Sequence, residues 1–89
     1  DGLAPPDAVF IGGGAADDGI FEACWAALSP GGRLAANVVT VEGEQALFAW
    51  RERAGGELTR IAVSHAEPLG GLTGWRPQMA VTQFMAVKP

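Results

Sequence analysis

Residues 8–14 have the sequence AVFIGGG, and residues 28–39 have the sequence LSPGGRLAANVV. Each segment places a short apolar run beside a cluster of glycines, and such runs are typical of strands that are buried on both faces. A helical pattern lies between the two segments, so together they predict a β-α-β unit with parallel strands. In open α/β sheets, ligands bind beyond the carboxyl ends of the strands. The functional edge is therefore expected at residues 12–14 and 37–40.

Two amphipathic helices are predicted from the spacing of the apolar residues. A helix after residue 17 would bury a single stripe made of Phe21, Cys24, Trp25 and Leu28. A second helix is expected to begin after Thr40, which is a suitable N-cap residue. Its buried face would consist of Ala46, Leu47, Trp50 and Ala54.

The remainder of the chain predicts two more strands, over residues 58–64 and 79–87, joined by a glycine-rich loop over residues 68–77. Parallel neighbours need a crossover connection, usually a helix, and no helical pattern occurs between these strands. They are therefore predicted to be antiparallel. The expected element order is β-α-β-α-β-loop-β, with a parallel start and an antiparallel finish.

Length and composition limit the possible classes of protein. The chain has 89 residues, of which 48% are hydrophobic and 18% are charged, which is typical of one small globular domain. A net charge of −4 with only six Lys and Arg residues argues against nucleic-acid binding. No apolar stretch approaches the roughly 20 residues that span a bilayer. One cysteine, Cys24, excludes an internal disulfide. We expect a cytoplasmic protein that binds neither membranes nor nucleic acid.

Candidate ligand contacts follow the first two predicted strands. The glycines at 12–14 would let a ligand approach the backbone, because no Cβ atom is in the way. They are not a dinucleotide fingerprint, since Asp17 stands where G-x-G-x-x-G requires its third glycine. Asn37 and Thr40 offer neutral hydrogen-bonding groups. A plain turn at residues 12–14, and strand-end or helix-capping roles for Asn37 and Thr40, remain alternative interpretations.

Trp75 and Arg76 form a second candidate site, just before the last predicted strand. An exposed aromatic ring beside a guanidinium suits a flat ligand that carries carboxylates, through stacking and bidentate hydrogen bonds. The alternative is that Trp75 folds back and covers an edge of the sheet.

Several segments resemble, in order, the precorrin-6Y C5,15-methyltransferases (decarboxylating). They are PDAVFIGG at 6–13, PGGRL at 30–34, NVVTVE at 37–42 and GELTRIAVS at 56–64, with GWRP at 74–77 and VTQ at 81–83. The element order also resembles the C-terminal half of the class I S-adenosylmethionine-dependent methyltransferases, whose last strand inserts antiparallel into a parallel sheet. The expected fold is therefore half of a Rossmann-like α/β domain.

The resemblance implies a function. Its members transfer a methyl group from S-adenosylmethionine to a meso carbon of a tetrapyrrole precursor of cobalamin, and they remove carbon dioxide from an acetate side chain. Gly12 and Gly13 would lie beside the cofactor, and Asn37 and Thr40 would face the substrate. Trp75 and Arg76 would suit the flat, carboxylate-bearing precorrin. The resemblance leaves the catalytic residues unassigned and implies no metal site.

The 89 residues contain neither the family's glycine-rich cofactor loop nor its acidic ribose-binding residue. The chain is therefore expected to be a partial domain over 1–89, with the cofactor-loop half preceding Asp1 and with weak cofactor binding alone. Its first strand would then expose an apolar edge, which predicts a homo-oligomer. Two alternatives are another class I small-molecule methyltransferase and a non-enzymatic dimerisation or regulatory module.

Overall fold

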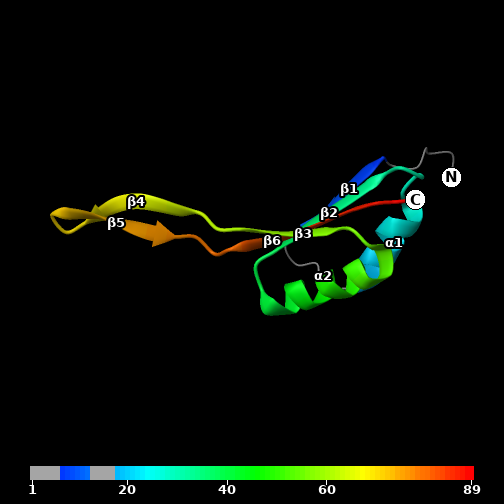
Figure 1. Cartoon of the computed structure of the whole chain (residues 1–89), viewed down its shortest axis with the longest axis horizontal. Helices are drawn as coiled ribbons and strands as arrows, with labels where there is room; N and C mark the ends of the chain where they lie inside the picture. Colours follow the sequence, from blue (N-terminus) through cyan, green and yellow to red (C-terminus); the bar gives the residue numbers. More distant parts are fainter. Residues whose placement is uncertain (1–6, 13–17) are drawn as a thin grey trace.

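A computed structural model of the protein describes residues 7–12 and 18–89. Figure 1 shows both helices on one side of a sheet, and a two-stranded ribbon that projects beyond it. The molecule is correspondingly long, with dimensions of 61 × 25 × 19 Å. In chain order, the elements are β1 (Ala8–Ile11), α1 (Asp18–Ala27), β2 (Arg33–Val38), α2 (Val41–Ala54), β3 (Glu57–Ile61), β4 (Ser64–Leu69), β5 (Leu72–Pro77) and β6 (Val81–Val87).

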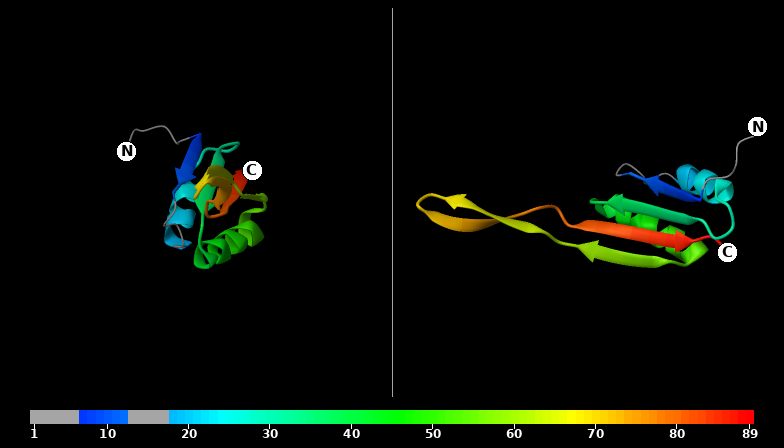
Figure 2. Two further views of the ribbon diagram at one scale, coloured as in Figure 1. Left: turned by 90° about the vertical axis from the view of Figure 1, so that its left-hand side faces the viewer. Right: turned by 90° about the horizontal axis from the view of Figure 1, so that it is seen from above.

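The main sheet has four strands in the order β1-β2-β6-β3. β1 and β2 are parallel, with Ile11 opposite Ala36. β6, the last strand in sequence, lies between β2 and β3 and is antiparallel to both. This arrangement confirms the predicted parallel start and antiparallel finish. The carboxyl ends of β1, β2 and β3 consequently lie at one edge of the sheet, and the ribbon of β4 and β5 leaves from that same edge (Figure 2).

The hydrophobic core lies between the sheet and the two helices. The ring of Trp50 in α2 lies 4.7 Å from that of Phe21 in α1 and 6.1 Å from that of Phe84 in β6, between centroids. These aromatic contacts join both helices to the sheet. The predicted helix faces are confirmed: Phe21, Leu28, Ala46, Leu47 and Trp50 are buried, and Cys24, Trp25 and Ala54 are partly buried beside them.

Helix α2 begins where the sequence predicts, and it packs unusually close to β2. Thr40 is the N-cap residue, and its Oγ1 accepts a hydrogen bond of 2.9 Å from the backbone N–H of Gly43. Acidic residues occupy the first turn and basic residues the last, as the helix dipole favours. A Cβ atom on Gly43 would lie 2.6 Å from the Cβ of Val38, so only glycine permits this contact.

One face of the main sheet is open, and this corrects the prediction that its first strands are buried on both faces. Phe10 of β1 is 62% exposed, and Met85 and Val87 of β6 are also exposed. The physical reason is that α1 and α2 both cover the opposite face. The apolar runs at residues 8–11 and 33–38 were therefore sufficient to predict strands but not to predict burial of both sides.

The predicted loop over residues 68–77 is wrong, because this segment lies within an antiparallel hairpin. β4 and β5 pair from Ser64 opposite Pro77 to Leu69 opposite Leu72. Gly70 begins the turn with a φ of +61°, a value that favours glycine. Two residues of the type Gly-Gly between strand-like runs are a recognised hairpin signal. The prolines and glycines around this turn masked that signal in the sequence.

Lys88, which follows β6, forms hydrogen bonds with the end of α1 and with the turn before β2. Its Nζ donates hydrogen bonds to the carbonyl oxygens of Ala26, at 3.2 Å, and Leu28, at 2.7 Å. Gly31 N donates to Lys88 O, and Lys88 N donates to Gly32 O, both at 2.8 Å. Because the last carbonyls of a helix lack intrahelical partners, a cation beside the end of α1 is favourable.

Candidate functional site

The first candidate site lies at the edge formed by the carboxyl ends of β1 and β2. Gly12 directly follows β1 and is exposed, and a Cβ atom at this position would meet nothing within 4 Å. Since Ile11 pairs with Ala36, the next position along each chain brings Gly12 level with Asn37. The structure therefore brings these two predicted site residues together. Gly13 lies outside the described residues.

Asn37 is half-buried on the open face of the sheet, opposite the helices. Its cross-strand neighbour is Gln83 of β6, whose Nε2 donates a hydrogen bond of 3.1 Å to Asn37 Oδ1. Gln83 belongs to the VTQ segment of the resemblance, and no role was predicted for it. The contact between Gln83 and Asn37 could be predicted only from the antiparallel register of β2 and β6. The sequence of either strand alone does not give that register.

Thr40 lies just beyond β2, where its hydroxyl oxygen serves as the N-cap of α2. The oxygen already accepts the hydrogen bond from Gly43 N, although the hydroxyl retains its own proton as a donor. The capping alternative therefore describes the observed contact, and substrate contact by Thr40 stays a prediction.

A polar cluster that the sequence did not reveal lies between α2, β3 and β6. Glu44 Oε2 accepts hydrogen bonds from Thr82 Oγ1 at 2.5 Å and from Arg60 at 2.9 Å. The Thr82 hydroxyl and then the Arg60 guanidinium hold the pKa of the Glu44 carboxyl below its ordinary value of 4.5. This cluster ties the first turn of α2 to the sheet, close to the edge that carries Asn37. Its three members are far apart in sequence, so only the fold brings them together.

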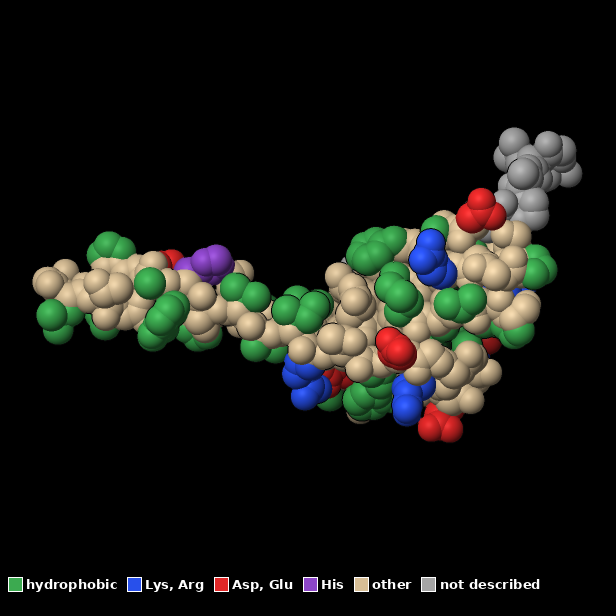
Figure 3. Space-filling model, turned by 45° about the horizontal axis from the view of Figure 1, so that its top comes forward, with side chains coloured by type: hydrophobic (Ala, Val, Ile, Leu, Met, Phe, Trp, Pro, Cys, Tyr) green, Lys and Arg blue, Asp and Glu red, His purple; other side chains and the backbone are tan. Residues whose placement is uncertain are grey.

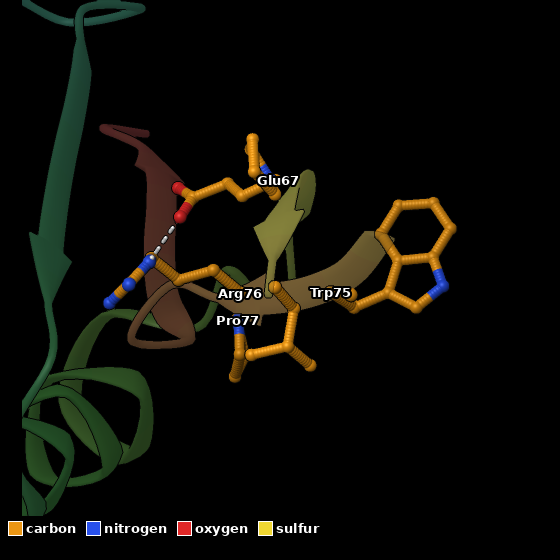
Figure 4. Close-up of a pocket in the computed structure, with 7 residues that line it drawn as sticks. Glu67, Trp75, Arg76 and Pro77 are labelled. Atoms are coloured by element: carbon orange, nitrogen blue, oxygen red, sulfur yellow. Dashed lines mark hydrogen bonds and ion pairs between the residues drawn. The ribbon is translucent and has the colours of Figure 1, made fainter. Parts of the chain in front are cut away.

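Trp75 and Arg76 lie on the hairpin and not at the edge of the main sheet. As neighbours on β5 they point to opposite faces of the ribbon. Trp75 is 75% exposed and covers no sheet edge, while Arg76 Nε donates a hydrogen bond of 2.6 Å to Glu67 Oε1. Figure 4 shows this ion pair and the indole ring on the two sides of a shallow pocket of about 210 Å³, which Pro77 also lines.

Two kinds of feature are absent from residues 7–12 and 18–89. In these ranges, no helix is long and apolar enough to cross a membrane. The same residues contain no group of three or more His, Cys, Asp or Glu side chains placed to hold a metal ion.

Comparisons with known proteins give a consistent result. A family model described as a precorrin methyltransferase domain matches residues 1–88. A precorrin-6Y C(5,15)-methyltransferase [decarboxylating] from a Sinorhizobium species is 52% identical over 87 residues, which cover 98% of this chain and 21% of that protein. The chain thus spans about a fifth of the length of this curated relative.

Solved structures agree with the sequence comparison. A Corynebacterium diphtheriae domain assigned to the precorrin-6Y C5,15-methyltransferases superposes with a TM-score of 0.89 at 45% identity, covering 96% of this chain and 50% of that one. The C-terminal domain of precorrin-6Y C5,15-methyltransferase from Rhodobacter capsulatus gives a TM-score of 0.86 at 40% identity, covering 98% and 47%. Each structure is about twice as long as the matched segment.

Proposed function

Because the chain belongs to the family of precorrin methyltransferase domains, we propose that it forms part of an S-adenosylmethionine-dependent, decarboxylating methyltransferase of cobalamin biosynthesis. The observation that carries the proposal is the 52% identity over 98% of the chain to a precorrin-6Y C(5,15)-methyltransferase. The proposed substrate is a precorrin tetrapyrrole. The alternative is a methyltransferase that acts on another small molecule. It would require this chain to have a different substrate from a relative with which it is 52% identical.

The cofactor side of the site is supported by one described residue. Gly12 follows β1, is exposed, and leaves open space where other residues carry a Cβ atom, so its backbone would be accessible to S-adenosylmethionine. When bound, this cofactor supplies the methyl group. We assign Gly13 to the same role on the resemblance alone. The chain offers no further described group for the ribose or the amino acid part, so we expect its own affinity for the cofactor to be low.

The proposed substrate contacts lie in two regions: Asn37 and Thr40 at the edge of the main sheet, and Trp75 and Arg76 on the two faces of the hairpin. Asn37 lies level with Gly12, and its amide would orient the tetrapyrrole near the transferred methyl group, since methyl transfer depends mainly on alignment. The exposed indole of Trp75 would stack on a flat ring. Arg76 commits its Nε to Glu67, and among the described residues no partner occupies its terminal nitrogens, which would be available to a carboxylate.

A binding experiment tests the proposal. We would prepare the 89-residue chain and a hybrid in which this chain replaces the 87 matched residues of the Sinorhizobium relative. The hybrid is expected to bind S-adenosylhomocysteine in a calorimeter and to methylate a precorrin, while the chain alone binds weakly or not at all. If the unmodified relative binds and a folded hybrid does not, the proposed function is wrong and a non-enzymatic interaction module becomes the better account.

We also propose that the chain self-associates, and two surfaces support this. β1 lies at an edge of the sheet with Phe10 exposed, as the sequence predicted for a strand open to pairing. Exposed apolar side chains also occur along the hairpin (Figure 3), and they include Leu69, Leu72 and Trp75. Sedimentation of the chain over a range of concentrations tests the proposal, and a monomer at high micromolar concentration would contradict it. Cytoplasmic location and the lack of nucleic-acid binding stay predictions.

A further inference from the structure

A row of neutral polar side chains crosses the open face of the main sheet. Asn37 of β2 stands opposite Gln83 of β6, and Gln83 stands opposite Thr59 of β3. In the neighbouring row on the same face, Ala35 stands opposite Met85, and Met85 stands opposite Glu57. Because side chains alternate between the faces of a strand, the three polar groups lie side by side on one surface. Beyond their contacts with one another, these groups present hydrogen-bond donors and acceptors to a ligand on one surface.

The hydrogen bond between Gln83 and Asn37 fixes the orientation of the side-chain amide of Asn37. Gln83 Nε2 donates to Asn37 Oδ1 at 3.1 Å, so the carbonyl oxygen of Asn37 faces β6. The two branches of a planar amide diverge, and the amide nitrogen Nδ2 therefore lies on the side away from β6. That side is the side of β1, where Gly12 leaves open space. Within the described part of the chain, no group accepts a hydrogen bond from Asn37 Nδ2.

We propose that Gln83 is a positioning residue that holds the Asn37 amide as a hydrogen-bond donor toward Gly12, and that this donor selects a carboxylate of the substrate. The inference rests on the proposed function, because it names the group of the tetrapyrrole that the site recognises. An ionised acceptor is favoured, since a charge-assisted hydrogen bond is roughly twice as strong as a neutral one. The same geometry disfavours a ligand that can only donate.

Substitutions at Gln83 distinguish orientation from packing. A glutamate at this position can only accept, so Gln83→Glu would draw Nδ2 of Asn37 toward β6 and turn Oδ1 toward Gly12. Gln83→Leu would remove the hydrogen bond to the Asn37 amide, so that this amide is no longer held in one orientation but is not turned round. Thr59→Val is the matched control, since it removes the polar group on the opposite side of Gln83 from Asn37.

The probe is uroporphyrin, a tetrapyrrole with acetate and propionate side chains, beside its fully methylated ester, and both are read by fluorescence quenching in the hybrid protein. We expect Gln83→Glu to weaken uroporphyrin binding about ten-fold, as loss of a hydrogen bond to a charged group implies. Gln83→Leu should weaken it less, and Thr59→Val should leave it unchanged. Binding of the ester should change little in all three variants.

A double-mutant cycle excludes simple repulsion by the new carboxylate. If Gln83→Glu acts through Asn37, its effect should largely disappear in an Asn37→Ala background. If the ten-fold loss persists there, if the ester loses affinity equally, or if unmodified hybrid does not prefer uroporphyrin to its ester, the proposal is wrong.

Asn37→Asp provides an independent variant in case Gln83→Glu does not fold. An aspartate would still accept from Gln83 but would present only acceptors to Gly12, so the same selective loss of uroporphyrin binding is expected. Equal affinity of this variant and the unmodified hybrid for uroporphyrin would also overturn the proposal. Binding of S-adenosylhomocysteine and methyl transfer are measured on the same proteins. A hybrid that methylates precorrin normally but shows no selective loss would refute this inference and leave the proposed function standing.

Discussion

The body of the molecule and its hairpin use the same kinds of residue with opposite results. In the body, Leu34, Leu47 and Trp50 have no exposed surface, whereas Leu69, Leu72 and Trp75 of the hairpin are 68%, 79% and 75% exposed. The difference is the second layer: α1 and α2 cover the main sheet, and nothing in the described chain covers the ribbon. Hydrophobic residues therefore predict where a protein can bury surface, and the neighbouring elements decide whether it does.

The largest expected difference in the free energy of unfolding comes from replacing one tryptophan in each region with alanine. Trp50→Ala should destabilise the chain by about 3–5 kcal/mol, because it removes a large side chain from the aromatic cluster with Phe21 and Phe84. Trp75→Ala should change the free energy of unfolding by less than about 0.5 kcal/mol. Chemical denaturation at low protein concentration measures both. Similar losses in the two variants would show that the hairpin is covered in solution.

The second comparison replaces one glycine with alanine in each region, which adds the same methyl group to both. Gly43→Ala should cost about 1–3 kcal/mol, since the new Cβ would lie 2.6 Å from the Cβ of Val38 and push α2 from β2. Gly71→Ala, in the hairpin turn, meets nothing within 4 Å and should be nearly neutral. Thermal unfolding followed by circular dichroism gives both values. A neutral Gly43→Ala would mean that helix and strand are less closely packed than described.

The third comparison uses acid to distinguish the Glu44–Arg60 ion pair of the body from the Glu67–Arg76 ion pair of the hairpin. The pKa of Glu44 is lowered by Thr82 and Arg60, so its carboxylate stabilises the fold above its ordinary pKa of 4.5, and this contribution is lost as the pH falls through the folded-state value. Glu44→Gln should therefore lower the melting temperature near neutrality and reduce its fall on acidification. Melting curves between about pH 6 and pH 3 measure this dependence. Glu67→Gln in the hairpin is the control, and equal behaviour of the two variants would contradict the assignment.

The smallest expected effect concerns the exposed pair in the hairpin. Arg76→Ala removes the ion pair with Glu67, and because the Arg76 side chain is 71% exposed the cost should be below about 1 kcal/mol. Added salt should reduce even this difference, since dissolved ions screen the interaction between exposed charges. Denaturation in low and high salt checks the result. A larger, salt-resistant loss would indicate that the pair is buried by another molecule.

Local signals predicted most of the body correctly. The glycine clusters marked the ends of β1 and the start of β2, the apolar spacing found both helix faces, and Thr40 is the N-cap that the sequence indicated. The hairpin was missed because Pro68, Gly74 and Pro77 are unfavourable in strands, whereas the Gly70-Gly71 turn favours pairing. Here the turn outweighed the strand propensities.

The candidate site was predictable only where it depends on one segment. Asn37 could be placed at the end of a strand from its own neighbours, but its contact with Gln83 joins residues that are 46 positions apart. The Glu44 and Thr82 contact spans 38 positions in the same way. Both contacts arise from the register of β6, which depends on the packing of the whole sheet and not on any local pattern.

The position of β6 also sets the order of events during synthesis. Ribosomes deliver the chain from its amino end at about 5–20 residues per second, so β2 and β3 emerge before the strand that joins them. Until residues 81–87 arrive, the two halves of the sheet have no shared hydrogen bonds, and Trp50 lacks its contact with Phe84. The nascent chain must therefore leave one edge of β2, the whole of β3 and an incomplete aromatic cluster without partners until residues 81–87 are made. Pairing of such sequence-distant segments is intrinsically slow. Chaperones that bind exposed strands and apolar side chains should consequently act on this segment during that interval.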